Sequence, residues 1–307
     1  MNQDTVELTF PNADQHLVQE FERKLQIIRD RVSSVAHNYH TGCYLVGRPG
    51  TSKTYTVMEE LGRMECPSLC KNARMSPWGL FCTIDEHREH VIVLDDITSL
   101  FKNGQAMEIL LAALDGTPGQ RRNITYKTKD VDLNVPFMGA IIAISNVPMR
   151  CDPLARALGS RIVVLEHEPT DDEVAAFMRH LAAKGFMDLD GHECSEVAEF
   201  VIAETRQYDL RLDLRHLTKA WQDYRQFKHG HSQTTWRDLV RTSLQKAARE
   251  PAVPLGKRED LELQRQKVRQ ALVQFPDDRQ AQMEASGLRQ STFYKRLKEV
   301  LAEQRAA

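Results

Sequence analysis

Hydrophobic residues follow different patterns in successive parts of the chain. Apolar positions from Val18 to Val35 recur at helical spacing, so residues 1–40 are predicted to form a long amphipathic helix. Short apolar runs then alternate with helical patterns through residues 41–168, as expected for a parallel sheet covered by helices. Residues 169–249 have helical periodicity throughout. The segment "EPAVPLGKRED", residues 250–260, contains two prolines and a glycine and predicts a linker, and a small helical domain is expected over 261–307.

The segment "GCYLVGRPGTSKTYTVMEEL", residues 42–61, has the order of a phosphate-binding loop. A short apolar strand precedes a turn of small residues, and a helix is predicted to begin at Lys53. The segment departs from the pattern G-x-x-x-x-G-K-[ST] only at Ser52, where glycine is usual, so the loop is expected to be slightly strained. Lys53 would reach the β- and γ-phosphates of ATP, and Thr54 would bind Mg²⁺. The predicted nucleotide-binding residues are Gly47, Arg48, Pro49, Gly50, Thr51, Ser52, Lys53, Thr54 and Tyr55.

A second apolar strand ends in two adjacent carboxylates. The segment "VIVLDDI", residues 91–97, places Asp95 at the strand end, where it can hold Mg²⁺ through water. Asp96 can polarise the attacking water. With one strand and one helix between the loop and this pair, the two motifs together indicate an ATP site that uses Mg²⁺.

With these motifs, residues 40 to 230 resemble the AAA+ ATPase family. "GRPGTSKT" resembles its Walker A loop and "VIVLDDI" its Walker B strand. "AIIAISNVP" is similar to the sensor-1 strand, which implies that Asn146 orients water near the γ-phosphate. "LARALGSRIVVL" resembles the segment with the arginine finger; Arg161 is the first candidate and Arg156 the second. "LDLRHLTKAW" resembles the start of the sensor-2 helix, with Arg215 directed at the phosphates.

The resemblance implies a P-loop NTPase α/β fold with a parallel sheet and an AAA+ helical lid. Two positions depart from the family pattern: Ser52 replaces glycine, and Asp96 replaces the more frequent glutamate. Paired aspartates also resemble the replication-initiator and helicase-loader branch. Slow hydrolysis, with ATP acting as a switch, is therefore an alternative to a fast motor.

Polar and apolar residues alternate on either side of "KTKD", which predicts a β-hairpin over about residues 121–137. The hairpin resembles the pre-sensor-1 hairpin of AAA+ helicases, including the viral superfamily 3 type, which grips the DNA backbone in a central pore. Its predicted DNA-binding residues are Arg121, Arg122, Lys127 and Lys129, whose phosphate contacts would depend on salt. The alternative is an ordinary solvated hairpin.

The C-terminal segment, residues 278–303, resembles a helix-turn-helix module that binds duplex DNA. Gly287 is expected in the turn, and Leu288 and Phe293 in the core. Residues 257–307 contain eleven Lys and Arg against eight Asp and Glu, a modest basic bias. The second helix is expected to present Gln290, Ser291, Thr292, Lys295, Arg296 and Lys298 to DNA. Such modules also serve as protein contacts, so a protein partner remains an alternative.

The composition and net charge limit the class of protein to which this chain can belong. The 307 residues are 41% hydrophobic and 27% charged with a net charge of −2, as in soluble globular proteins, so any DNA-binding surface must be local. The longest apolar run is too short to span a bilayer, and the polar N-terminus does not resemble a signal peptide. We therefore expect a cytoplasmic protein with its six cysteines reduced and no membrane partner.

Together these patterns predict an oligomeric ATP-dependent AAA+ ATPase acting on DNA, such as a replication helicase or initiator of a mobile element. Because an arginine finger completes a neighbour's site, the chain is expected to form a homo-oligomeric ring or spiral. One alternative is a slow ATP-switch helicase loader or transposition regulator that coats DNA and recruits a replication or transposition protein. The other is an ATPase that remodels proteins.

Overall fold

A computed structural model describes most of the chain as two compact units, Met1–Gln245 and Lys246–Ala307. The described ranges are 12–72, 75–96, 103–129, 131–147, 157–249, 264–265, 267–269, 271–272, 274–276, 278–288 and 290–306. The predicted linker, residues 250–260, lies outside them.

Five parallel strands form the sheet of the first unit, in the order β2-β3-β6-β1-β7. Cys43 of β1 lies opposite Ile142 of β6 and Val163 of β7, which sets the register at the centre of the sheet. The strands are β1 (Gly42–Val46), β2 (Ser68–Asn72), β3 (Val91–Asp95), β6 (Ala140–Ser145) and β7 (Val163–Glu166). The three central strands are almost wholly buried because helices cover both faces, which explains why they are continuous apolar runs.

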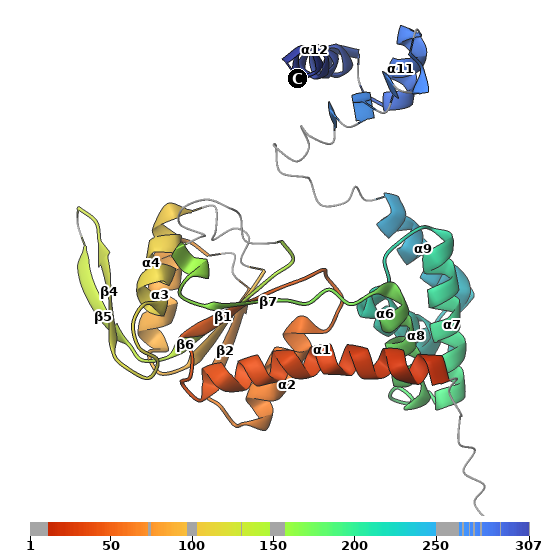
Figure 1. Cartoon of the computed structure of the whole chain (residues 1–307). Helices are drawn as coiled ribbons and strands as arrows, with labels where there is room; N and C mark the ends of the chain where they lie inside the picture. The colour runs from red at the N-terminus through yellow and green to blue at the C-terminus, as the bar shows by residue number, and fades with distance from the viewer. Residues whose placement is uncertain are drawn as a thin grey trace, which may run out of the picture. The chain divides into compact units, whose positions relative to one another are not determined.

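Each face of the sheet belongs to a different core. Cys43 and Leu45 pack with α1 (Asn12–Ala36), α2 (Lys53–Arg63) and the helices of the C-terminal half of the unit. Tyr44 and Val46, which point to the opposite face, pack with α3 (Pro77–Glu86) and α4 (Gly104–Leu114). In Figure 1, α1 and α2 lie on one side of the sheet and α3 and α4 on the other. The long amphipathic helix predicted over residues 1–40 is present as α1 over residues 12–36, with its apolar stripe turned toward the core, and residues 1–11 lie outside the described residues.

Four helices follow the sheet, in the region that the sequence analysis predicted to be a helical lid. They are α6 (Asp171–Ala183), α7 (Gly191–Gln207), α8 (Leu214–Lys228) and α9 (Trp236–Arg249). Capping boxes begin α6 at Thr170 and α7 at Asp190, and the Asp213 carboxylate accepts a hydrogen bond from the Arg215 backbone N–H at the start of α8. These caps fix where each helix begins, and the cap of α8 places Arg215 in its first turn.

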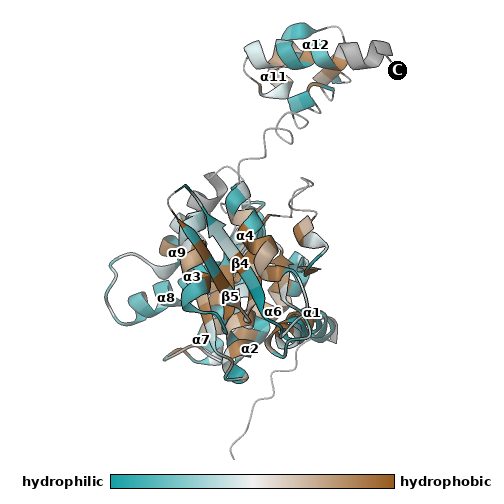
Figure 2. Ribbon diagram, turned by 90° about the vertical axis from the view of Figure 1, so that its left-hand side faces the viewer, coloured by the Kyte–Doolittle hydropathy of each residue, from teal (hydrophilic) through white to brown (hydrophobic). Residues whose placement is uncertain are grey.

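The predicted hairpin is confirmed as β4 (Arg122–Lys127) paired with β5 (Asp132–Phe137). Ile124, Val135 and Phe137 are buried on one face of the hairpin and share a core with α3 and α4. Figure 2 shows hydrophilic and hydrophobic residues interspersed along both strands.

The second unit contains α11 (Arg279–Ser286) and α12 (Gln290–Ala306). Gly287 lies between them with φ +62°, a conformation that glycine adopts without strain. Phe293 is fully buried and Leu288 packs beside it, as predicted. The helix, glycine turn and second helix are therefore present.

The predicted fold class is confirmed: a P-loop-type parallel α/β sheet is followed by a helical region and by further C-terminal helices. Within the described part of the chain, no helix is both long enough and apolar enough to cross a membrane.

Candidate nucleotide-binding site

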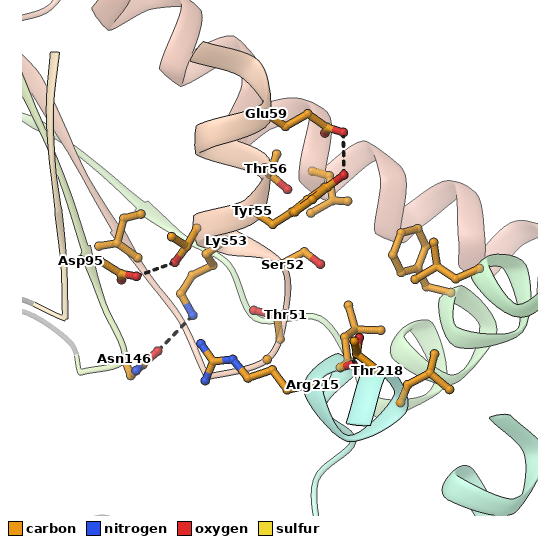
Figure 3. Close-up of a pocket in the computed structure, with 18 of the residues that line it drawn as sticks. Thr51, Ser52, Lys53, Tyr55, Thr56, Glu59, Asp95, Asn146, Arg215 and Thr218 are labelled. Atoms are coloured by element: carbon orange, nitrogen blue, oxygen red, sulfur yellow. Dashed lines mark hydrogen bonds between the residues drawn. The ribbon is translucent and has the colours of Figure 1, made fainter. Parts of the chain in front are cut away.

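The candidate site lies at the carboxyl ends of three neighbouring strands. Because β3, β6 and β1 are adjacent in the sheet, Asp95, Asn146 and the loop of residues 47–52 meet at one edge. The Lys53 ammonium donates to Asn146 Oδ1 at 3.3 Å, and the Thr54 hydroxyl donates to Asp95 Oδ2 at 3.0 Å (Figure 3). Side chains from three separate sequence motifs are thus in direct contact.

The backbone of the loop requires small residues at defined positions. A Cβ on Gly47 would lie 2.1 Å from the His167 carbonyl oxygen, so only glycine fits there. Gly50 has φ +70°, and a Cβ on it would lie 1.8 Å from Asp213 Oδ1. Ser52 has φ 68° and ψ 10°, the left-handed conformation in which glycine is favoured. The strain predicted at Ser52 is therefore present in its backbone.

Lys53 is held inside the loop. Its side chain is buried, and its ammonium donates to the carbonyl oxygens of Gly47 at 2.7 Å and Arg48 at 2.5 Å. Burial, and then the positive charge of Arg215, lower the pKa of Lys53 to about 8. An anion placed beside this ammonium would favour its charged form, so the environment is suited to phosphate.

A cavity of about 950 Å³ opens beside the loop. Figure 3 shows Arg215 extending from α8 toward Lys53 and Asn146 across this space. The polar wall contains Gly50, Thr51, Ser52, Lys53, Thr54, Tyr55, Asp95, Asp96, Asn146 and Arg215. Arg215 therefore faces the loop that was predicted to hold the phosphates.

An apolar wall, which the sequence motifs did not reveal, forms the other part of the cavity. It comes from α1, α6 and α8 and contains Leu25, Phe177, Leu181, Leu217 and Trp221. Pockets for small molecules commonly combine such a wall with a few polar groups. Each of these residues also fits a helical packing pattern, so the sequence contains no separate signal for them.

The residues predicted to hold Mg²⁺ fit a hard cation. Thr54 and Asp95 place a hydroxyl and a carboxylate oxygen side by side, and oxygen ligands of this kind suit Mg²⁺. Asp96 lines the same cavity, is exposed, and has φ 54°. Its carboxylate is thus at the mouth of the site, one residue beyond the predicted ligand.

Several predicted nucleotide-binding residues differ in position from the expectation. The Arg48 side chain points away from the cavity and bonds to Pro169 and Leu212 carbonyl oxygens. Tyr55 is 68% exposed, and its hydroxyl donates to Glu59 at 3.1 Å. Pro49 is exposed as well. Of these three, only Tyr55 lines the cavity.

Arg161 lies outside the cavity of its own chain. Its guanidinium donates to the Ala157 carbonyl oxygen at 2.8 Å and to Asp115 at 3.3 Å, in an exposed position. The second candidate for the finger, Arg156, lies outside the described residues.

The hairpin requires a correction at Arg122. Sequence reasoning placed this residue among the DNA-binding cations, but its side chain is buried. It donates to the carbonyl oxygens of Ala113 and Gly139 and lies over the Phe137 ring, 4.9 Å from its centroid. Burial lowers its pKa to about 10. Arg122 therefore holds the hairpin to the domain.

The other three cations of the hairpin are exposed. Lys127 forms an ion pair with Asp132 on the opposite strand, and both side chains are solvent-accessible. Arg121, directly before β4, and Lys129, in the turn after β4, are both exposed. Surface ion pairs of this kind contribute little and break readily, so Lys127 remains available to a phosphate.

A second correction concerns Arg296 in α12. It was predicted to face DNA, but it is buried and donates to both Glu299 carboxylate oxygens. Thr292 is half-buried. The remaining predicted residues, Gln290, Ser291, Lys295 and Lys298, are exposed. Tyr294, which was not among the predicted residues, is exposed as well.

Comparisons with known proteins add little to this geometry. No protein-family model matches the sequence, and neither does any curated protein. Among solved structures, a mutant of RuvB from Thermotoga maritima aligns with 89% of this chain and 83% of its own, at 12% identity and a TM-score of 0.45. The fold assignment depends on the strand order and on the position of the loop.

Proposed function

We propose that this protein is an AAA+-type ATPase that acts on DNA. The observation that supports the ATPase most strongly is the convergence of Lys53, Asp95 and Arg215 on one cavity, from three motifs far apart in the sequence. A lysine inside a phosphate loop, a carboxylate beside a hydroxyl, and an arginine from the lid are the groups that phosphoryl transfer requires. Mg²⁺, when bound, would neutralise charge on the phosphates.

Each residue has a separate role in the proposed hydrolysis. The backbone N–H groups of the loop and the Lys53 ammonium hold the phosphates. Thr54 and Asp95 hold the metal ion, and Asn146, already bonded to Lys53, orients the attacking water with Asp96. Arg215 stabilises charge on the transferred phosphoryl group. Leu25, Phe177 and Trp221 of the apolar wall enclose the base.

The proposed assembly is a homo-oligomer in which Arg161 reaches a neighbouring nucleotide. Its exposed position away from its own cavity supports this arrangement. In the oligomer, Arg121, Lys127 and Lys129 contact a DNA strand through phosphates. In the second unit, Gln290, Ser291, Lys295 and Lys298 contact duplex DNA. A replication or transposition protein is the proposed partner.

A slow ATP switch is the second candidate, and Ser52 favours it. A left-handed serine in the loop and an aspartate in place of glutamate at position 96 both favour slow turnover over a fast motor. In that case the protein binds DNA when ATP is present and separates no strands.

The deciding experiment is steady-state ATP hydrolysis with no DNA, single-stranded DNA or duplex DNA, with Lys53→Ala as the control. Stimulation by single strands that the variant abolishes supports a translocating enzyme. ATP-dependent DNA binding with little turnover supports the switch. If DNA neither binds nor alters the rate, the DNA function is wrong, and stimulation by an unfolded polypeptide would point to protein remodelling.

A further inference from the structure

The Arg48 side chain joins the phosphate loop to the lid. Its guanidinium forms an ion pair with Asp171 at 2.7 Å and donates to the carbonyl oxygens of Pro169 and Leu212, both at 3.1 Å. The Arg48 backbone N–H donates to Glu168 at 2.8 Å. All four partners belong to the connection after β7 or to the lid, more than a hundred residues from the loop.

Two other points of the loop are tied to the same region. The Leu214 backbone N–H, at the start of α8, donates to the Gly50 carbonyl oxygen at 2.9 Å. His167 Nε2 bonds the Thr51 carbonyl oxygen at 3.0 Å, with the ring nitrogen donating. Gly50 and Thr51 make these contacts through backbone carbonyl oxygens, whereas Arg48 makes its contacts mainly through a charged side chain. Only 11% of the Arg48 side chain is exposed.

These attachments surround a loop that contains a strained residue. Ser52 occupies the left-handed region, which disfavours a non-glycine residue by a factor of about ten. Its side chain accepts no capping hydrogen bond at the start of α2. No capping hydrogen bond therefore offsets the strain at Ser52. The contacts that Arg48, Gly50 and Thr51 make with the region after β7 hold the strained backbone in place.

The electrostatics of the Arg48–Asp171 ion pair agree with a fixed position of the phosphate loop. Burial raises the pKa of Asp171, but the charge of Arg48 and the hydrogen bonds from Arg48, Arg211 and the Leu212 backbone N–H together outweigh it, so the pKa lies below its usual value. Asp171 is also the first residue of α6, and its carboxylate accepts from the Leu212 backbone N–H at 3.2 Å. The carboxylate thus links the beginning of two lid segments to the loop.

We propose that Arg48 is a positioning residue for the nucleotide: by anchoring the loop to Asp171, Pro169 and Leu212, it holds Ser52 in the left-handed conformation that presents the loop to phosphate. ATP affinity then depends on the lid even without a contact between Arg48 and the nucleotide. A glycine at position 52 would adopt this backbone without the anchor. The inference rests on the proposed nucleotide binding and on no assumption about DNA.

The test is a double-mutant cycle that measures the Kd of a fluorescent ATP analogue. Arg48→Ala is expected to weaken binding about tenfold, because the loop relaxes away from its left-handed shape. Ser52→Gly alone is expected to change Kd less than about twofold, since the anchor already maintains the shape. In the double variant, Kd should return to within about threefold of wild type. A purely structural role for Arg48 predicts no such rescue.

Arg179→Ala is the matched control. Arg179 lies on α6, is 28% exposed and pairs with Asp14 and Glu199, but it does not line the cavity or touch the loop. Its loss should leave Kd unchanged. Asp171→Asn removes only the charge at the other end of the anchor, and a loss of about threefold is expected, again rescued by Ser52→Gly. Asp171→Asn, alone and combined with Ser52→Gly, replaces the Arg48 variants in the test if circular dichroism shows that Arg48→Ala does not fold.

Two results would overturn the inference: wild-type affinity in Arg48→Ala, or a double variant as weak as Arg48→Ala alone. Both differ from failure of the proposed function, in which the wild-type protein itself does not bind the ATP analogue.

Discussion

The phosphate loop and the hairpin both contain basic residues predicted from sequence motifs, but the environments of these side chains differ between the two regions. In the loop, Lys53, a defined position of the motif, is buried among partners that converge on one cavity, whereas Arg48, a variable position, is bonded to Asp171, Pro169 and Leu212 instead. In the hairpin, one predicted cation, Arg122, is buried for packing, and another, Lys127, has an acidic neighbour across the strands. The spacing of a motif therefore identifies residues more reliably where backbone geometry demands them than where only their charge is counted.

The largest expected effect is at Lys53, which tests the loop side of this contrast. Lys53→Ala should weaken ATP binding about a thousandfold, about 4 kcal/mol, because a charge-assisted phosphate contact is lost. Titration with a fluorescent ATP analogue measures it. Lys71→Ala, at an exposed lysine of β2, should bind normally. Equal affinity in Lys53→Ala and the control would mean that the loop is not the phosphate site.

The adjacent residues Arg121 and Arg122 provide the sharpest test of the hairpin side. Arg122→Ala should lower the free energy of unfolding by about 3 kcal/mol, because two buried carbonyl oxygens lose their donor. Arg121→Ala, at an exposed position, should change it by less than about 0.5 kcal/mol. Urea denaturation of both variants checks this. The contrast fails if Arg122→Ala is as stable as wild type but binds DNA more weakly.

The next effect concerns His167, which directly follows β7 and bonds to the loop at Thr51. Burial, opposed only in part by its bond to Thr51, lowers the pKa of His167 to about 4. Below pH 6.5 the unfolded chain takes up a proton that the folded chain does not, so stability falls as the pH is lowered. Between pH 6.5 and pH 5 this histidine alone should lower the free energy of unfolding by about 1.6 kcal/mol, which unfolding measurements across the range would detect.

His167→Gln is the control for that pH dependence. Glutamine keeps a donor for the Thr51 carbonyl oxygen but does not titrate, so its stability should vary less with pH over the same range. An identical slope in wild type and variant would assign the pH dependence to other groups.

The smallest expected effect is on DNA binding by the hairpin. Each cation that contacts a phosphate of a single strand adds about 0.7 to the magnitude of the slope of log K against log salt. Replacing Lys127 and Lys129 by alanine should therefore lower that magnitude by about 1.4, with little change in thermal stability. Fluorescence anisotropy with labelled single-stranded DNA at several salt concentrations measures it. An unchanged slope would leave the hairpin as an ordinary solvated one.

Local patterns determined the elements of this protein and most of its candidate site. The apolar runs of β1, β3 and β6 are long enough and sufficiently rich in strand formers to identify buried strands, and the residues that follow them must meet at one edge of a parallel sheet. The glycine-rich loop, Lys53 and Asp95 followed from spacing alone, because backbone geometry around a phosphate permits few residue types.

Only the tertiary structure decided which charges are buried and what surrounds the loop. Arg122 and Arg296 could not be told from exposed cations by their sequence context. Arg122 is buried against the Ala113 and Gly139 carbonyl oxygens, which packing brings near, and Arg296 is buried on the side of α12 that contains Phe293, Leu297 and Val300. The apolar wall of the cavity and the partners of Arg48 come from helices distant in sequence. Spacing along a chain specifies periodicity and local backbone conformation, but contacts between distant segments arise from how their surfaces pack together.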